Sequence, residues 1–131
     1  MNPAVHNQMA QFAYTHVHDA LTQSIKPSEF RSLARSFPSM LQANGLCASI
    51  AFLYAKSKDN GPHQQLYMLI DKWIQTNLTA PEAKKEALAQ RITHLNSSEY
   101  RLYTTAVMNL CLWVKRYAEG MVEADGKEQN R

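Results

Sequence analysis

The amino-acid sequence predicts an all-α protein, a single-domain bundle of about six or seven helices. Three observations lead to this prediction. Apolar residues recur every three or four positions over most of the chain, and no stretch alternates apolar and polar residues long enough to suggest a strand. The four Gly and five Pro residues are scattered singly, mostly where such helices would begin or end. A chain of 131 residues that is 45% hydrophobic suits one core.

The first three helices are expected before residue 45. The first covers about 3–23, and the second begins at Pro27 or Ser28. The second is expected to end before Pro38, because proline disfavours a helical residue in front of it. A short third helix is expected over about 39–43. Asn44-Gly45 then breaks the chain, since glycine readily takes a positive φ.

Turn and capping signals delimit the later helices. Asp59-Asn60-Gly61-Pro62 is a strong turn signal, Thr79 with Glu82 forms a capping box, and Ser97 is expected to cap the last helix. A polar tail is expected over 122–131, which leaves 1–121 as the helical domain. The later helices are expected over about 46–58, 62–77, 81–95 and 98–121.

The last of these helices carries two apolar stripes. The first stripe comprises Tyr100, Tyr103, Val107, Leu110, Val114, Tyr117 and Met121, and the second comprises Leu102, Ala106 and Trp113. A long helix with two apolar stripes either lies at the centre of its bundle or binds a neighbour with its second face. Trp113 and Tyr117 could accordingly belong to the core or stack on nucleic-acid bases.

The sequence offers little for catalysis. His16 and His18 point to different sides of a helix and cannot share a metal, and no His-Glu-x-x-His, Cys-x-x-Cys, phosphate-binding glycine loop or Gly-x-Ser-x-Gly is present. Cys47 and Cys111 lie in apolar patterns and are expected to be buried reduced thiols. We therefore expect no catalytic residue, no metal and no cofactor. With no apolar run of membrane-spanning length and no signal peptide, a cytoplasmic protein is expected.

Positive charge is concentrated in the body of the chain. The net charge is +3, and residues 1–118 contain 12 Lys and Arg against 7 Asp and Glu. Such a surplus favours either contact with a phosphate backbone or an ordinary solvated surface. Arg31 and Arg35 lie four residues apart on one helix face, where RNA contact and a solvated face are equally compatible with the pattern. Further bases come later in the chain, at Lys56, Arg101, Lys115 and Arg116.

Several segments resemble the small subunit family of type III-B CRISPR (Cmr) effector complexes. The segment 36–46, with Pro38-Ser39-Met40-Leu41 and Asn44-Gly45-Leu46, is followed by 51–56, and both resemble the central signature of that family. Segments 98–101 and 113–118 resemble its C-terminal signature. One departure is Thr105, where the family tends to have an acidic residue. The resemblance extends from about the first helix to Ala118.

The resemblance implies a role without catalysis. Family members are all-helical and stack as a short filament beside the backbone subunits, so that the two filaments enclose a channel for guide and target RNA. The implied partners are the backbone subunit, the large subunit, neighbouring copies of the same chain, guide RNA and target RNA, with no membrane. RNA contacts are expected at Lys56, Arg101, Lys115 and Arg116 from the matching segments, and at Arg31 and Arg35 from the charge pattern.

Three other interpretations remain open from the sequence. The chain could be a protein-only helical scaffold without direct RNA contact, an enzyme, or the related small subunit of type III-A complexes. The segments 44–46 and 113–118 favour the type III-B family.

Overall fold

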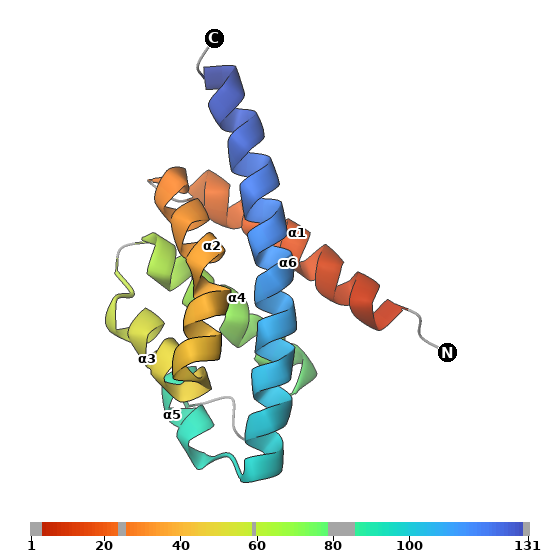
Figure 1. Ribbon diagram of the computed structural model, residues 1–131, viewed down its shortest axis with the longest axis vertical. Coiled ribbons are helices and arrows are strands. Elements are labelled where there is room, and N and C mark those ends of the chain that lie inside the picture. Colours follow the sequence, from red (N-terminus) through yellow and green to blue (C-terminus); the bar gives the residue numbers. More distant parts are fainter. Residues whose placement is uncertain (1–3, 24–25, 59, 79–85, 130–131) are drawn as a thin grey trace.

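A computed structural model describes residues 4–23, 26–58, 60–78 and 86–129 of the chain (Figure 1). These residues form six α-helices and one 3₁₀-helix, with no strand among them, which confirms the predicted all-α fold. The helices are α1 (Ala4–Gln23), α2 (Pro27–Asn44), α3 (Leu46–Ala55), α4 (Pro62–Asn77), α5 (Leu88–Arg91), the 3₁₀-helix Ile92–His94 and α6 (Ser97–Gln129).

The long helix α6 runs the length of the molecule, with α2 beside it and α1 crossing it (Figure 1). Its buried side chains recur at three and four residues: Tyr103, Val107, Leu110, Val114 and Ala118. These form one continuous core with buried residues of α1, α2, α3, α4 and α5. The first of the two apolar stripes is therefore the one that faces the core.

Helix α2 continues through Pro38, so the prediction that it ends there was wrong. The residues expected as a separate helix over 39–43 form its last turns. A proline inside a helix costs about 3 kcal/mol. The apolar stripe, however, crosses it without interruption, with Phe30 and Phe37 before the proline and Leu41 after it, all buried. Each such side chain contributes about 1.5 to 3 kcal/mol on burial, so their sum outweighs the local cost.

Some of the other predicted helix boundaries agree with the structure and some do not. The bounds of α4 agree with the prediction. Helix α3 ends at Ala55 instead of Lys58, and α6 continues to Gln129 instead of ending at about Met121. The continuous helix predicted over 81–95 is wrong in its described part, because Ala87 is extended (φ −61°, ψ 145°) and only a short helix and a 3₁₀ turn follow. The capping box at Thr79 lies outside the described residues.

The cap of α6 is Asn96, one residue before the predicted Ser97. The Glu99 amide donates to Asn96 Oδ1 (2.8 Å), and the Asn96 amide donates to Glu99 Oε1 (3.0 Å). This reciprocal pair is a capping box, which satisfies two amides that a helix start otherwise leaves without partners.

The junction between α2 and α3 is fixed by the start of α6. Gly45 has φ 87° and ψ 170°, and its amide donates to the Leu41 carbonyl at the end of α2. The Cys47 amide, in the first turn of α3, donates to the Tyr100 hydroxyl at 2.9 Å. The break predicted at Asn44-Gly45 is thereby confirmed, and two segments distant in the sequence meet there.

Replacing Tyr100 with Phe should lower the free energy of unfolding by about 1 kcal/mol, because the Cys47 amide loses its acceptor. Urea unfolding followed by far-ultraviolet circular dichroism measures this. Tyr54→Phe is the control, since that ring is 54% exposed and its change should have little effect. Equal stability of the two variants would show that the hydroxyl does not hold the junction.

Candidate nucleic-acid interface

One face of α6 carries two of the predicted cations in a regular row. The row steps by four and three residues through Arg101, Thr105, Met108, Leu112, Lys115 and Glu119. This spacing puts the side chains on one side of an α-helix. Arg101 is exposed and Lys115 is half-buried. At 1.5 Å per residue they lie roughly 21 Å apart along the axis, a length over which RNA could be contacted more than once.

Helix α2 runs antiparallel to this row and adds Arg31 and Arg35, one helical turn apart. The two helices are joined where Arg35 Nε donates to Glu119 Oε2 at 3.1 Å. Both side chains are partly exposed, so the pair contributes no more than about 1 kcal/mol. We use the name α2–α6 seam for the surface strip that these two helices form. Its α2 side comprises Arg31, Arg35 and Gln42, and its α6 side is the row from Arg101 to Glu119.

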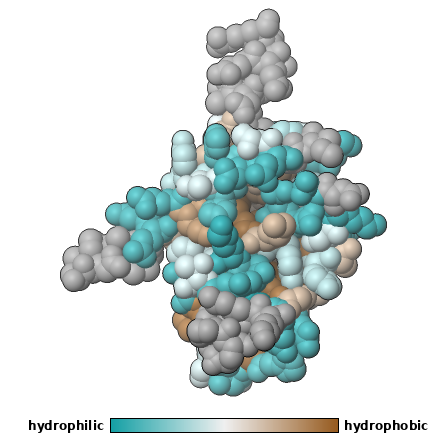
Figure 2. All heavy atoms as spheres, turned by 180° about the vertical axis from the view of Figure 1, so that it is seen from behind, coloured by the Kyte–Doolittle hydropathy of each residue, from teal (hydrophilic) through white to brown (hydrophobic). Residues whose placement is uncertain are grey.

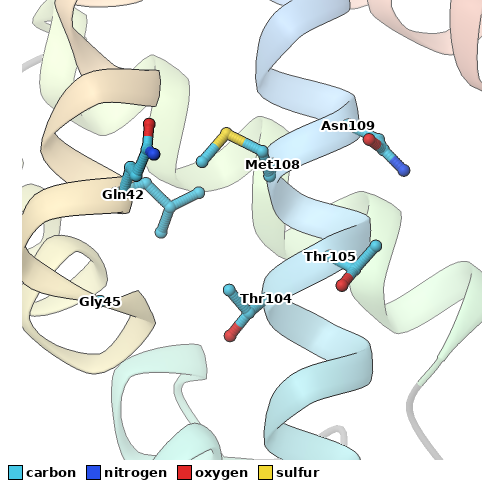
Figure 3. Close-up of a pocket in the computed structure, with 7 residues that line it drawn as sticks. Gln42, Gly45, Thr104, Thr105, Met108 and Asn109 are labelled. Atoms are coloured by element: carbon cyan, nitrogen blue, oxygen red, sulfur yellow. The ribbon is translucent and has the colours of Figure 1, made fainter.

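A notch of about 380 Å³ interrupts the seam near the start of α6 (Figure 3). Figure 3 shows Met108 and Thr104 pointing from α6 toward α2, whereas Asn109 points away. The walls of the notch contain no charged side chain, and they include Thr105. Because Thr105 is uncharged, it places no carboxylate beside Arg101, which lies four residues earlier on that face. The lining residues are Leu41, Gln42, Gly45, Thr104, Thr105, Met108 and Asn109.

Lys56 lies away from the seam. It caps the end of α3. In Figure 1, α3 lies on the other side of α2 from α6. Its ammonium group lies 5.6 Å from the centre of the Phe52 ring. The pKa of His63 is lowered, mainly by burial and further by the nearby Lys56 charge, while Glu29 opposes the shift. The lowered pKa favours the neutral form of His63 near pH 7. Lys56 thus lies among Phe52 and His63, apart from the other five predicted cations.

Arg116 lies beside aromatic rings on a neighbouring flank of α6. Its Cζ is 5.3 Å from the centre of the Trp113 ring, and Trp113 is stacked on Tyr117 with ring centres 5.8 Å apart. Tyr14 of α1 meets Tyr117 edge to face at 5.4 Å. Sequence reasoning missed Tyr14, because the crossing of α1 over α6 is a tertiary contact that no local pattern signals.

The opposite side of the molecule contains a cleft that is poorly suited to a polyanion. Figure 2 shows that side as mainly hydrophilic, with hydrophobic areas between. A cleft of about 380 Å³ between α1 and α4 has no acidic or basic side chain apart from a histidine; it is lined by Gln8, Gln11, Phe12, Thr15, His16, Trp73, Thr76 and Asn77. His16 stacks on Phe12 there, with ring centres 3.9 Å apart. This cleft could hold neutral groups but offers no lysine or arginine to phosphate.

Groups suited to chemistry are not brought together in the described part of the chain. No set of three or more His, Cys, Asp or Glu among those residues is placed to hold a metal ion. Complete burial raises the pKa of the Cys111 thiol, which disfavours the reactive thiolate. None of the described helices has the length and apolar character that crossing a bilayer requires.

Comparisons with known proteins identify the family. The family model described as CRISPR-associated protein (Cas_Cmr5) matches residues 5–121. The fold is similar to that of a CRISPR-associated Cmr5 family protein from Thermus thermophilus, with a TM-score of 0.67 and 23% sequence identity over 88% of this chain and 97% of that chain. Because the family match spans nearly the whole chain, the protein belongs to the Cmr5 family of CRISPR-associated proteins, the small subunits of Cmr complexes.

Proposed function

We propose that this chain is a non-catalytic small subunit of a type III-B Cmr complex, and that its α2–α6 seam lines the channel for guide and target RNA. The observation that carries the proposal is the row of cations on two adjacent helices. Arg31, Arg35, Arg101 and Lys115 follow the seam, with one carboxylate, Glu119, in the described row. Arg116 lies on the adjoining flank.

Such a surface suits RNA that is recognised by base pairing elsewhere. In a guided complex the pairing between guide and target reads the sequence, so a lining subunit needs only shape and positive charge. Phosphate contacts from Lys and Arg position the RNA and give affinity that falls with salt. Each copy supplies few contacts, so stacking of copies as a filament beside the backbone subunits would multiply a weak interaction along one RNA.

The Lys56 contact stays a prediction separate from this surface. An RNA path that follows the seam does not pass the end of α3, where Lys56 lies beside Phe52 and His63. The protein-only scaffold is the second candidate. The scaffold can be distinguished from the RNA-lining subunit, because charge reversal on the seam of a scaffold would leave the salt dependence of RNA binding unchanged.

Reversing two seam charges, Arg101→Glu with Lys115→Glu, should weaken RNA binding by the assembled Cmr complex at least tenfold. The slope of log affinity against log salt should become shallower by about 0.7 for each phosphate that the variant no longer neutralises. Filter binding of guide-loaded complex to target RNA across a salt series measures both quantities.

The matched control changes the same number of charges elsewhere, with Lys58→Glu and Lys72→Glu, two exposed side chains off the seam. Its binding should stay close to that of the parent complex. If both double variants weaken binding equally, net charge alone is acting. If neither does and the complexes assemble normally, the scaffold is the better description.

A further inference from the structure

The second apolar stripe of α6 ends in a cluster of aromatic rings at the surface. The aromatic cluster comprises Tyr14, Trp113 and Tyr117, in which the Tyr117 ring of α6 meets both Tyr14 of α1 and Trp113 of α6. Tyr14 is 54% exposed, and Trp113 and Tyr117 are half-buried. Trp113 and Tyr117 pack against the core with part of their surface, while Leu110, Val114 and Ala118 fill the inward side of α6.

The helix positions around the cluster suit a negatively charged partner. The Arg116 guanidinium carbon lies 5.3 Å from the Trp113 ring centre. The residues three or four positions from Tyr14, Trp113 and Tyr117 in each helix include no Asp or Glu. Aromatic rings edged by cations are the arrangement with which proteins hold unpaired nucleotides, since rings stack on bases while cations meet phosphates.

Access to Tyr117 is kept open by a glycine. Gly120 lies three residues later on α6, and a methyl group added there would meet nothing within 4 Å. Any longer side chain at 120 would extend over the solvent-exposed flank next to the tyrosine. The cluster is therefore reachable from solvent on the flank where Arg116 also lies.

We propose that the aromatic cluster is a stacking surface for an unpaired RNA base, with Arg116 contacting the adjoining phosphate. This inference rests on the proposed function, since it adds a base contact to the phosphate contacts of the seam. RNA is favoured over a protein partner because the Arg116 guanidinium lies over the Trp113 ring, and a cation beside an aromatic ring complements a polyanion of any sequence.

The experiment compares two RNA oligonucleotides of equal length and charge on the assembled Cmr complex: one carries bases that are not complementary to the guide, and the other is abasic. The parent complex should bind the base-containing RNA more tightly. Trp113→Leu should reduce that preference about fivefold or more, because stacking contributes about 1 to 3 kcal/mol per base. Trp113→Phe should retain part of the preference. Tyr54→Leu, which alters a tyrosine on α3 that is as exposed as Tyr14, should leave the preference unchanged.

A second readout locates the contact. RNA carrying 5-iodouridine, irradiated in the complex, should crosslink to Trp113 or Tyr117. The inference is overturned if base-containing and abasic RNA bind alike, or if Trp113→Leu keeps the preference and crosslinks map elsewhere. It is also overturned if Trp113→Leu releases a protein subunit while RNA binding persists, which would make the cluster a protein interface.

Failure of the proposed function would look different. In that case both oligonucleotides would bind weakly with little salt dependence, and the seam variant Arg101→Glu with Lys115→Glu would bind like the parent. If RNA binding keeps its dependence on salt but shows no preference for bases, only the proposed stacking surface is contradicted, and the seam remains supported.

Discussion

Replacing Asp71 with Ala should destabilise the protein by about 3 to 5 kcal/mol, because it leaves a buried guanidinium group without a counter-charge. Arg91 is only 5% exposed, and its Nη2 donates to Asp71 Oδ1 at 2.8 Å across α5 and α4. Its Nη1 donates to the Glu86 carbonyl, which is an uncharged acceptor. The carboxylate is therefore the partner that makes burial of the Arg91 charge tolerable.

The reverse change should cost less. Arg91→Met leaves Asp71, whose side chain is 24% exposed and still accepts a hydrogen bond from Gln75 Nε2 at 3.0 Å. Partial hydration stabilises that carboxylate, so we expect a decrease of about 1 to 3 kcal/mol in the free energy of unfolding. The difference between the two variants follows from the deeper burial of Arg91 and from the hydrogen bond that Asp71 keeps with Gln75, since both variants break the same ion pair.

Urea unfolding of the two variants and the double variant measures the pair, with Arg35→Met as control. Arg35 pairs with Glu119 at the surface, and its removal should cost less than about 1 kcal/mol. If Asp71→Ala were no worse than Arg35→Met, the Arg91 site would have to open to water in solution.

Local signals in the sequence were enough to predict some elements well. The bounds of α4 could be predicted because Pro62 suits the first helical position and a turn signal precedes it. The path of α2 could not, because local rules weigh Pro38 by itself, while the buried stripe from Phe30 to Leu41 decides the outcome. The end of α3 was placed too late, since lysines at positions 56 and 58 fit a last helical turn as well as a loop.

For the candidate interface, too, local spacing predicted some features and tertiary packing determined the others. Arg101 and Lys115 could be placed on one face of α6 from helical spacing alone. The joining of Arg35 to Glu119 could not be predicted, because 84 residues separate them in the sequence. Two apolar stripes on α6 were visible, but which one the other helices cover depends on packing. The exposure of Trp113 and its contact through Tyr117 with Tyr14 therefore required the structure.

Replacing Gly45 with Ala should lower the free energy of unfolding by about 1 to 3 kcal/mol through backbone strain. Its φ of 87° with ψ of 170° is a conformation that only glycine adopts readily. Crowding is not the reason, since an added methyl group would lie 3.6 Å from Tyr100 Oη, an ordinary contact. The hydrogen bonds from the Gly45 amide to Leu41 and from the Ser49 amide to Gly45 keep the backbone from relaxing.

The matched control adds the same methyl group at Gly120, inside α6. That residue is exposed, and nothing lies within 4 Å of the added carbon. Alanine is the better helix former by about 0.5 to 1 kcal/mol, so Gly120→Ala should stabilise the protein. Two identical chemical changes should thus shift the urea midpoint in opposite directions. A Gly45→Ala variant as stable as the parent would mean that the α2–α3 junction adopts another backbone conformation. In that case the contact of Tyr100 with α3 and the shape of the notch would also differ, because Tyr100 bonds to the Cys47 amide and Gly45 lines the notch.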